Sequence, residues 1–216
     1  MPATRKKAPQ PDHPSPLDEL PPRRRAMLIA AVNVLMEQGY ARASTLEIAT
    51  RARVSKRELY AEFGSKRGIL EALIATSAMH MQVLLAPAEI GDRHALAAAL
   101  TAYGISALTT LTNPYVIALY RLAIAEAPAD AELGSILDLS GRQPSRRALI
   151  DIMRRGQIAG FMGLGDPDGM ASQFFALLMG DVMVWLLLGV AEQPSPTEIR
   201  ARAAAATAGV LALHPA

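Results

Sequence analysis

Apolar residues recur at three- and four-residue spacings along most of the chain, which is the spacing of one face of an α-helix. The first such segment, residues 23–38, ends before Gly39, a residue type that often follows a helix. Two short segments follow at 44–52 and 55–63, and a longer one at 65–85. Strand-forming residues are sparse, so the expected fold class is all-α, with about nine or ten helices.

Beyond residue 86, segments rich in proline and glycine separate longer helical runs. These runs are expected near 93–111, 115–126, 130–160, 168–190 and 197–212. Pro144 is expected to break or kink the run 130–160, because proline lacks the N–H that a helix interior needs. The run 168–190 contains the apolar stretch "FFALLMGDVMVWLLLGVA". Asp181 lies at its middle and would be costly in lipid, so a buried helix is favoured over a membrane span.

The two short segments carry helix start signals. Ser44 and Glu47 have the spacing of a capping box, and so do Ser55 and Glu58. Two helices of this length joined by a turn of about three residues form a helix-turn-helix. In that motif the second helix lies in the major groove of DNA, with its first residues at the base edges. The alternative is a plain three-helix bundle with a solvated charged face.

The charge distribution favours a nucleic-acid-binding head. Residues 1–68 contain 13 Lys and Arg against 7 Asp and Glu, a net charge of +6, and residues 69–216 have a net charge of −4. Residues 1–22 are basic, proline-rich and expected to be a disordered tail. A basic tail alone would leave the seven cations of the helical segment unexplained. The tail has no apolar segment typical of a secretory signal, so a cytoplasmic protein is expected.

The segment "RRRAMLIAAVNVLMEQGYARASTLEIATRARVSKRELYAEFGSKRGILEAL" resembles the N-terminal DNA-binding domain of TetR/AcrR-type regulators. The likeness is carried by Gly39-Tyr40, Ile48-Ala49, Ala52, Val54-Ser55-Lys56, Leu59-Tyr60, Phe63 and Ser65-Lys66. The segment "YRLAIAEAPADAELG" is similar, more loosely, to the second domain of one subgroup. The resemblance implies an all-α homodimer with a helix-turn-helix domain at 23–70 and a ligand-binding and dimerisation domain at 71–216. It also implies a repressor that a small molecule releases from a palindromic operator.

By position, the resemblance implies DNA contacts at Ser44, Thr45, Ser55, Lys56, Arg57, Tyr60 and Lys66. Lys56 and Arg57 are expected at base edges, and Ser44 or Thr45, Tyr60 and Lys66 at phosphates. The chain departs from the family pattern at Arg53, where the turn usually has glycine, and at Ala61-Glu62. A left-handed Arg53 would cost roughly 1–2 kcal/mol. Glu62 would either turn away from the phosphates or lower the non-specific affinity.

An apolar or amphipathic ligand is expected in the C-terminal domain, because residues 93–190 have many large apolar side chains and few charges. The expected lining residues are Tyr103, Tyr120, Phe161, Phe174 and Trp185, with Tyr115 and Phe175 as further candidates. The alternative is that most of them are ordinary core residues. Arg121 and Asp181 are expected to be buried, paired with each other or with a ligand group.

The last two helical runs are expected to form the homodimer. The run 168–190 is apolar nearly all round, and the run 197–212 is rich in small residues that let helices approach closely.

Other function classes have little support. The four histidines are dispersed and lack metal-ligand spacing, so neither a metal nor a cofactor is expected. The segment "DPDG" at 166–169 lacks the later carboxylates of a calcium loop and is expected to be a capped turn. No nucleophile–histidine–acid arrangement suggests an enzyme. A basic head that binds RNA or an acidic partner stays open as a second hypothesis, although RNA-binding surfaces usually have more stacking aromatics.

Overall fold

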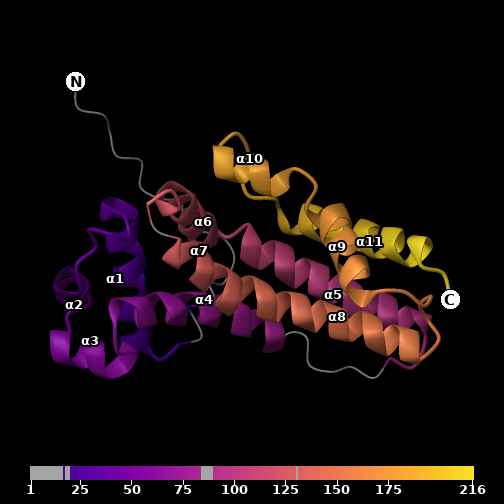
Figure 1. The fold of residues 1–216 in the computed structure, drawn as a ribbon, viewed down its shortest axis with the longest axis horizontal. Coiled ribbons are helices and arrows are strands. Elements are labelled where there is room, and N and C mark those ends of the chain that lie inside the picture. Colours follow the sequence, from indigo (N-terminus) through magenta and orange to yellow (C-terminus); the bar gives the residue numbers. More distant parts are fainter. Residues whose placement is uncertain (1–16, 18–19, 84–89, 130) are drawn as a thin grey trace.

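The fold is all-α, as expected. The computed structural model describes residues 17, 20–83, 90–129 and 131–216, and these form helices and no strand. The expected tail lies almost entirely outside the described residues. Three helices form a head at one end of the molecule (Figure 1), and a fourth leads from it into the larger body. They are α1 (Pro22–Gln38), α2 (Thr45–Ala52), α3 (Lys56–Phe63) and α4 (Lys66–Val83).

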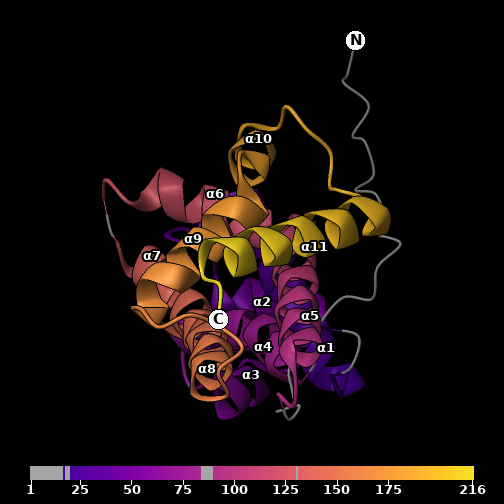
Figure 2. The same cartoon turned by 90° about the vertical axis from the view of Figure 1, so that its right-hand side faces the viewer.

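In the body, α5 (Arg93–Leu111) and α8 (Gln143–Ile158) run side by side along the long axis (Figure 1), and α11 (Pro196–Leu213) lies across them at an angle (Figure 2). Helices α5 and α8 pack together, and α11 packs on α5 and on α9 (Pro167–Met179). Helices α6 (Pro114–Glu126) and α7 (Glu132–Leu137) lie nearest the head, and α10 (Val182–Leu188) packs on α6. Within the described residues, the body therefore consists of helices packed on helices.

The expected run 130–160 is interrupted just before Pro144. Helix α7 ends at Leu137, a π-helical turn spans Asp138–Arg142, and α8 begins at Gln143. Proline has no N–H to donate, and its ring crowds the carbonyl four residues earlier, so the regular bonding pattern must change there. The expected break or kink at Pro144 is therefore present as a π-helical turn just before it, through which the chain stays helical.

The prediction of one continuous helix over 168–190 is wrong. Gly180 has φ 45° and ψ −127°, a conformation open to glycine because it has no Cβ. The chain bends by 55° there, and α10 starts at Val182. The bend directs α10 away from α9 and onto α6.

Two large apolar clusters hold the molecule together. The first joins α1–α4 with residues of α6 and α7, such as Leu119 and Ile136. The second lies between α5, α8, α9 and α11. By length and composition α5 is apolar enough to cross a membrane, as is the bent pair α9 and α10, but α5 buries Tyr103 and Leu108 inside the second cluster. Because the first cluster includes α6 and α7, the head shares its core with the body.

Candidate nucleic-acid interface and ligand cavity

The first helix of the helix-turn-helix has a cap that differs from the predicted one. The Ser44 hydroxyl accepts a hydrogen bond from the Leu46 N–H at 3.2 Å. Glu47 does not close the box, because its carboxylate instead accepts bonds from Gln38 of α1 and from Arg51. The Gln38 amide and then Arg51 hold the pKa of Glu47 below its usual value. The predicted Ser44–Glu47 capping box is therefore wrong, although α2 begins where expected.

The second helix has the predicted capping box. The Glu58 N–H donates to the Ser55 hydroxyl at 3.1 Å, and the Ser55 N–H donates to the Glu58 carboxylate at 2.8 Å. That backbone bond is the main reason why the pKa of Glu58 is lowered. Leu59 and Phe63 are buried against α1 and α4, so the opposite face of α3 is left to solvent.

The turn between the two helices is left-handed at Arg53. This residue has φ 56° and ψ 41°, and it is the one non-glycine residue of the described chain with a positive φ. Its backbone N–H closes α2 by donating to the Thr50 carbonyl at 3.1 Å. A residue with a Cβ is strained in this conformation. The side chain is exposed, so the departure from glycine adds a cation to the surface of the motif.

Three of the expected DNA-contacting residues meet on one exposed surface. The Thr45 and Tyr60 hydroxyls are 3.1 Å apart, which joins the start of α2 to α3. The Lys56 ammonium lies 5.6 Å from the centre of the Tyr60 ring. The two hydroxyls share one hydrogen bond and leave one O–H to donate, which suits a phosphate oxygen.

Most arginines at the back of the head are paired with carboxylates. The ion pairs are Arg23 with Glu58, Arg24 with Glu62, Arg51 with Glu37 and Glu47, and Arg67 with Glu71 and Glu132. By contrast, exposed Arg53, Lys56 and Arg57 have no carboxylate partner among the described residues. Three cations without a carboxylate therefore gather at the turn and the first turn of α3, whereas Arg42 and Lys66 donate to backbone carbonyls near the loop before α2. The pair with Arg24 also explains Glu62, whose charge is neutralised by α1.

Lys66 has a different environment from the one expected of a phosphate contact. Its ammonium donates to the carbonyls of Tyr40, Ala41 and Ala43, the last two at 3.3 Å, and lies 4.4 Å from the centre of the Tyr40 ring. These contacts use the three donors of an ammonium group. Lys66 therefore positions the loop before α2, and a phosphate would have to compete with these carbonyls.

The same loop is held from the body by residues that sequence reasoning missed. The Glu126 carboxylate, at the end of α6, accepts bonds from the backbone N–H groups of Tyr40 and Ala41. Gly39 has φ 79°, and a Cβ there would lie 3.2 Å from that carboxylate. Glu132 accepts from the Tyr40 hydroxyl at 3.3 Å. No local signal predicts Glu126, because its partners lie 85 and 86 residues earlier.

A cavity of about 420 Å³ lies between the helices of the body. This volume falls within the roughly 300–1,000 Å³ of small-molecule sites. Its lining is mostly apolar and comprises Ile74, Thr110, Leu111, Val116, Leu119, Tyr120, Leu137, Gly141, Arg142, Ser145, Arg146, Ser172, Phe175, Met179 and Met183.

Of the five predicted ligand residues, Tyr120 alone lines this cavity within the described chain, together with the further candidate Phe175. Tyr103 and Phe174 are fully buried in the second cluster, with ring centres 6.0 Å apart. Phe161 packs at the edge of that cluster. The large aromatic rings mostly fill the core, which was the alternative given for them.

Trp185 lies on α10 with 44% of its surface exposed, and it is not among the residues that line the cavity. The further candidate Tyr115 packs against the first cluster. The expectation that Arg121 and Asp181 are buried and pair with each other is wrong, because Arg121 is exposed and donates to the carbonyls of Leu186 and Leu187 at 2.6 and 3.0 Å. Neither residue lines the cavity. Asp181 is exposed at the bend before α10.

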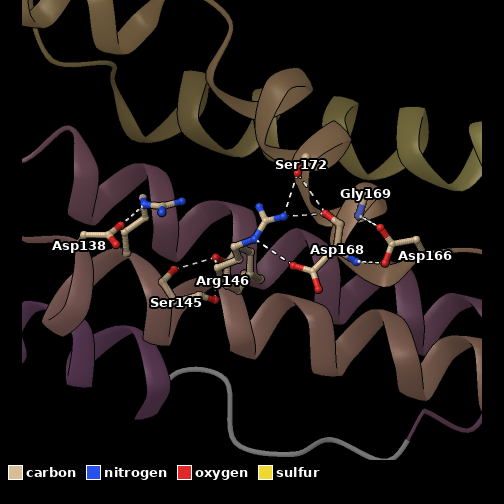
Figure 3. Close-up of polar contacts among 9 residues, drawn as sticks. Asp138, Ser145, Arg146, Asp166, Asp168, Gly169 and Ser172 are labelled. Atoms are coloured by element: carbon tan, nitrogen blue, oxygen red, sulfur yellow. Dashed lines mark hydrogen bonds and ion pairs between the residues drawn. The ribbon is translucent and has the colours of Figure 1, made fainter.

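Sequence reasoning also missed the two arginines of the cavity, Arg142 and Arg146. Arg146 reaches from α8 to the start of α9 (Figure 3), where it donates to the Asp168 carboxylate, to the Asp168 carbonyl and to Ser172 at 3.2, 2.7 and 2.9 Å. Asp166 caps α9 by accepting from the N–H groups of Asp168 and Gly169, so the predicted capped turn is confirmed. The Tyr103 hydroxyl lies 2.7 Å from the Ser145 hydroxyl, and burial raises the pKa of Tyr103.

Two protein families match this chain, one over the head and one over the body. Residues 28–73 match the bacterial regulatory proteins of the tetR family, and residues 98–214 match the C-terminal domain of AefR-like transcriptional repressors. No curated protein matches the chain. Among the described residues, no group of three His, Cys, Asp or Glu side chains forms a metal site.

Solved structures agree over nearly the whole chain. A TetR transcriptional regulator from Agrobacterium tumefaciens is 30% identical, with a TM-score of 0.73 over 90% of this chain and 95% of that one. The flavonoid-responsive regulator FrrA is 25% identical, with a TM-score of 0.69 over 89% and 96%. The regulator FadR from Bacillus subtilis, solved with stearoyl-CoA, shares the fold at 17% identity, with a TM-score of 0.63 over 86% and 96%. The chain therefore belongs to the TetR family, and it is a DNA-binding transcriptional regulator and not an enzyme.

Proposed function

We propose that this regulator is a homodimeric repressor that binds a near-palindromic operator and leaves it when a small molecule enters the body cavity. The observation that carries the proposal is the charge pattern of the head. Arg53, Lys56 and Arg57 are exposed without carboxylate partners at one edge of the described head, whereas Arg23, Arg24, Arg51 and Arg67 are paired. The match to AefR-like repressors supports the direction of regulation.

The proposed DNA-contacting residues fall into three groups, which contact bases, contact phosphates or cap the helices. Lys56 and Arg57 lie in the first turn of α3 and are proposed to contact base edges in the major groove. Thr45 and Tyr60 share a hydrogen bond and are proposed to hold a phosphate. Ser44 and Ser55 accept cap bonds through their hydroxyls, so their part is to place the helices.

The dimer interface is proposed on α9, α10 and α11. Five large apolar residues there are exposed by 44–70%: Leu177, Val184, Trp185, Leu188 and Leu213. Helix α11 presents Ala204, Ala205 and Ala208 to solvent, and such small side chains let a second helix approach closely. A two-fold dimer through this surface would bring two heads to the two halves of a palindrome.

Ligand control is proposed to act through α6. This helix contributes Val116, Leu119 and Tyr120 to the cavity, and Glu126 at its end holds the loop before α2. A ligand that prefers a conformation with a shifted α6 would displace that loop and the heads. A tenfold loss of operator affinity requires about 1.4 kcal/mol of differential binding between the two conformations.

Selection from a random duplex pool tests the function directly. We expect a near-palindromic sequence to be recovered, with weaker binding to the same sequence as RNA. In fluorescence anisotropy, Arg57→Ala should reduce the preference for one base pair in each half-site. Arg154→Ala removes an exposed cation from α8 in the body and is the matched control. Recovery of unrelated sequences, or equal losses in both variants, would contradict the proposal.

A further inference from the structure

We infer that the ligand of the body cavity is a compact apolar monoanion, such as a carboxylate on an aromatic or aliphatic body, whose charged end meets Arg142 and Arg146. The inference rests on the proposed function in one respect, namely that the cavity is the effector site. It concerns the chemical class of the ligand. The starting observation is that the two charged residues in the cavity lining are both arginines.

Arg146 keeps donors available after its protein contacts are made. Its Nε and Nη2 bond to Asp168 and Ser172, whereas Nη1 has no partner among the described residues (Figure 3). One quarter of the side chain is exposed, so the group is mostly withdrawn from bulk solvent. Its carboxylate partner Asp168 is 62% exposed and does not line the cavity, so water screens that ion pair.

Arg142 adds a second set of donors one helical turn away. Its Nε bonds to Asp138, and its two terminal nitrogens have no partner within the described chain. Both arginines line the cavity, but the Arg142 side chain is 60% exposed, so its guanidinium group lies closer to solvent than that of Arg146. Asp138, like Asp168, is absent from the lining, so the lining itself has two positive charges and no negative charge.

Tyr120 completes the polar side of the cavity. Its hydroxyl makes no hydrogen bond within the described residues, so it remains available as a donor; burial raises its pKa further above neutral pH. A carboxylate accepts hydrogen bonds at both oxygens and matches the fork of a guanidinium group. A neutral ligand would leave these donors less well paired, and a cationic ligand would meet two positive charges.

The rest of the lining sets the body of the ligand. Val116, Phe175, Met179 and Met183 present apolar surface from α6, α9 and the start of α10. Methionine side chains are flexible and adapt to aromatic and aliphatic shapes. A ligand with a single charge at one end and an apolar remainder therefore satisfies both parts of the cavity.

Matched pairs of acids and amides test this inference on the full-length protein. Calorimetric titration would compare 2-naphthoate with 2-naphthamide, and decanoate with decanamide. Each pair shares its apolar body and differs in charge. We expect the acids to bind at least about tenfold more tightly than the amides, since hydrogen bonds to charged groups are stronger than neutral ones. Acids and amides that bind equally, or carboxylates that do not bind at millimolar concentration, would overturn the inference.

Single substitutions test whether the two arginines cause the preference for acids over amides. Arg142→Gln and Arg146→Gln should each reduce the acid preference several-fold, whereas Arg147→Gln should retain it. Arg147 is an exposed neighbour on α8 outside the cavity lining, so it controls for net charge. If Arg146→Gln does not fold because α9 loses its contact, Arg142→Gln alone decides the question. An equal loss in Arg147→Gln would refute a specific site.

Operator binding separates this inference from the proposed function. If a carboxylate binds with the expected arginine dependence and operator affinity does not change, the ligand class stands and ligand control falls. If only neutral compounds bind and they release the operator, ligand control stands and the monoanion assignment falls.

Discussion

Replacement of Arg53 by glycine should stabilise the protein and weaken its DNA binding at the same time. The φ of 56° and ψ of 41° place this residue in the left-handed region, where a Cβ costs roughly 1–2 kcal/mol. Glycine removes that strain but makes the unfolded chain more flexible, which costs about 0.4–1 kcal/mol. The difference leaves a gain of about 1 kcal/mol in the free energy of unfolding. For a chain of this length that gain corresponds to an increase of about 2–4 °C in Tm.

The loss of the side chain has the opposite effect on the complex. Arg53 is exposed at the turn and has no carboxylate partner in the described structure, so we expect it to contact a phosphate. Each lost phosphate contact lowers the slope of log affinity against log salt concentration by about 0.9. Anisotropy titrations with one operator duplex at four or five salt concentrations measure that slope, and circular dichroism measures Tm.

Arg53→Ala is the matched variant, because it removes the same charge but keeps a Cβ in the left-handed conformation. We expect it to share the reduced salt slope of Arg53→Gly without the gain in stability. A glycine variant no more stable than the alanine variant would refute the strain calculation. A salt slope equal to that of the wild type in both variants would refute the phosphate contact.

Three further predictions concern the junction and the dimer. Lys66→Met should lower the free energy of unfolding by about 1–3 kcal/mol, because three carbonyls lose their donor. An unchanged Tm together with a reduced salt slope of DNA binding would instead support a phosphate contact. Glu126→Ala should speed hydrogen exchange at the amides of residues 40 and 41 about tenfold relative to the wild type. Unchanged exchange rates would argue against the proposal that Glu126 fixes the loop before α2. Leu188→Glu should give monomers at micromolar concentration in sedimentation, whereas Ile158→Glu, at an exposed apolar position on α8, should stay dimeric; a dimeric Leu188→Glu would count against the proposed interface.

Local signals predicted the head well, because neighbouring residues determine where its short helices begin. The Ser55–Glu58 capping box forms as its spacing indicates. The equivalent Ser44–Glu47 spacing fails because Glu47 finds Gln38 on α1, a partner that packing brings close. Identical spacing thus has two outcomes, and only the three-dimensional neighbours decide between them.

The body was harder to predict, since its breaks and its cavity depend on packing. Pro144 marks a boundary that its missing N–H makes visible in the sequence. The bend at Gly180 is harder to predict because apolar residues continue on both sides of it, although a glycine followed by Asp181 is itself a signal for a helix end. Aromatic residues are a poor guide to the cavity, because most of them pack in the core, whereas the four-residue spacing of Arg142 and Arg146 is visible in the sequence.

The internal pairing of the arginines in the head affects how the regulator searches a chromosome. Arg23, Arg24 and Arg51 already have carboxylate partners, so they displace few counterions when the head meets DNA. The affinity for arbitrary sequence is then lower than the net charge of residues 1–68 suggests. We therefore expect more of the protein to be in solution between encounters and to reach its target by three-dimensional diffusion more than by sliding along the duplex.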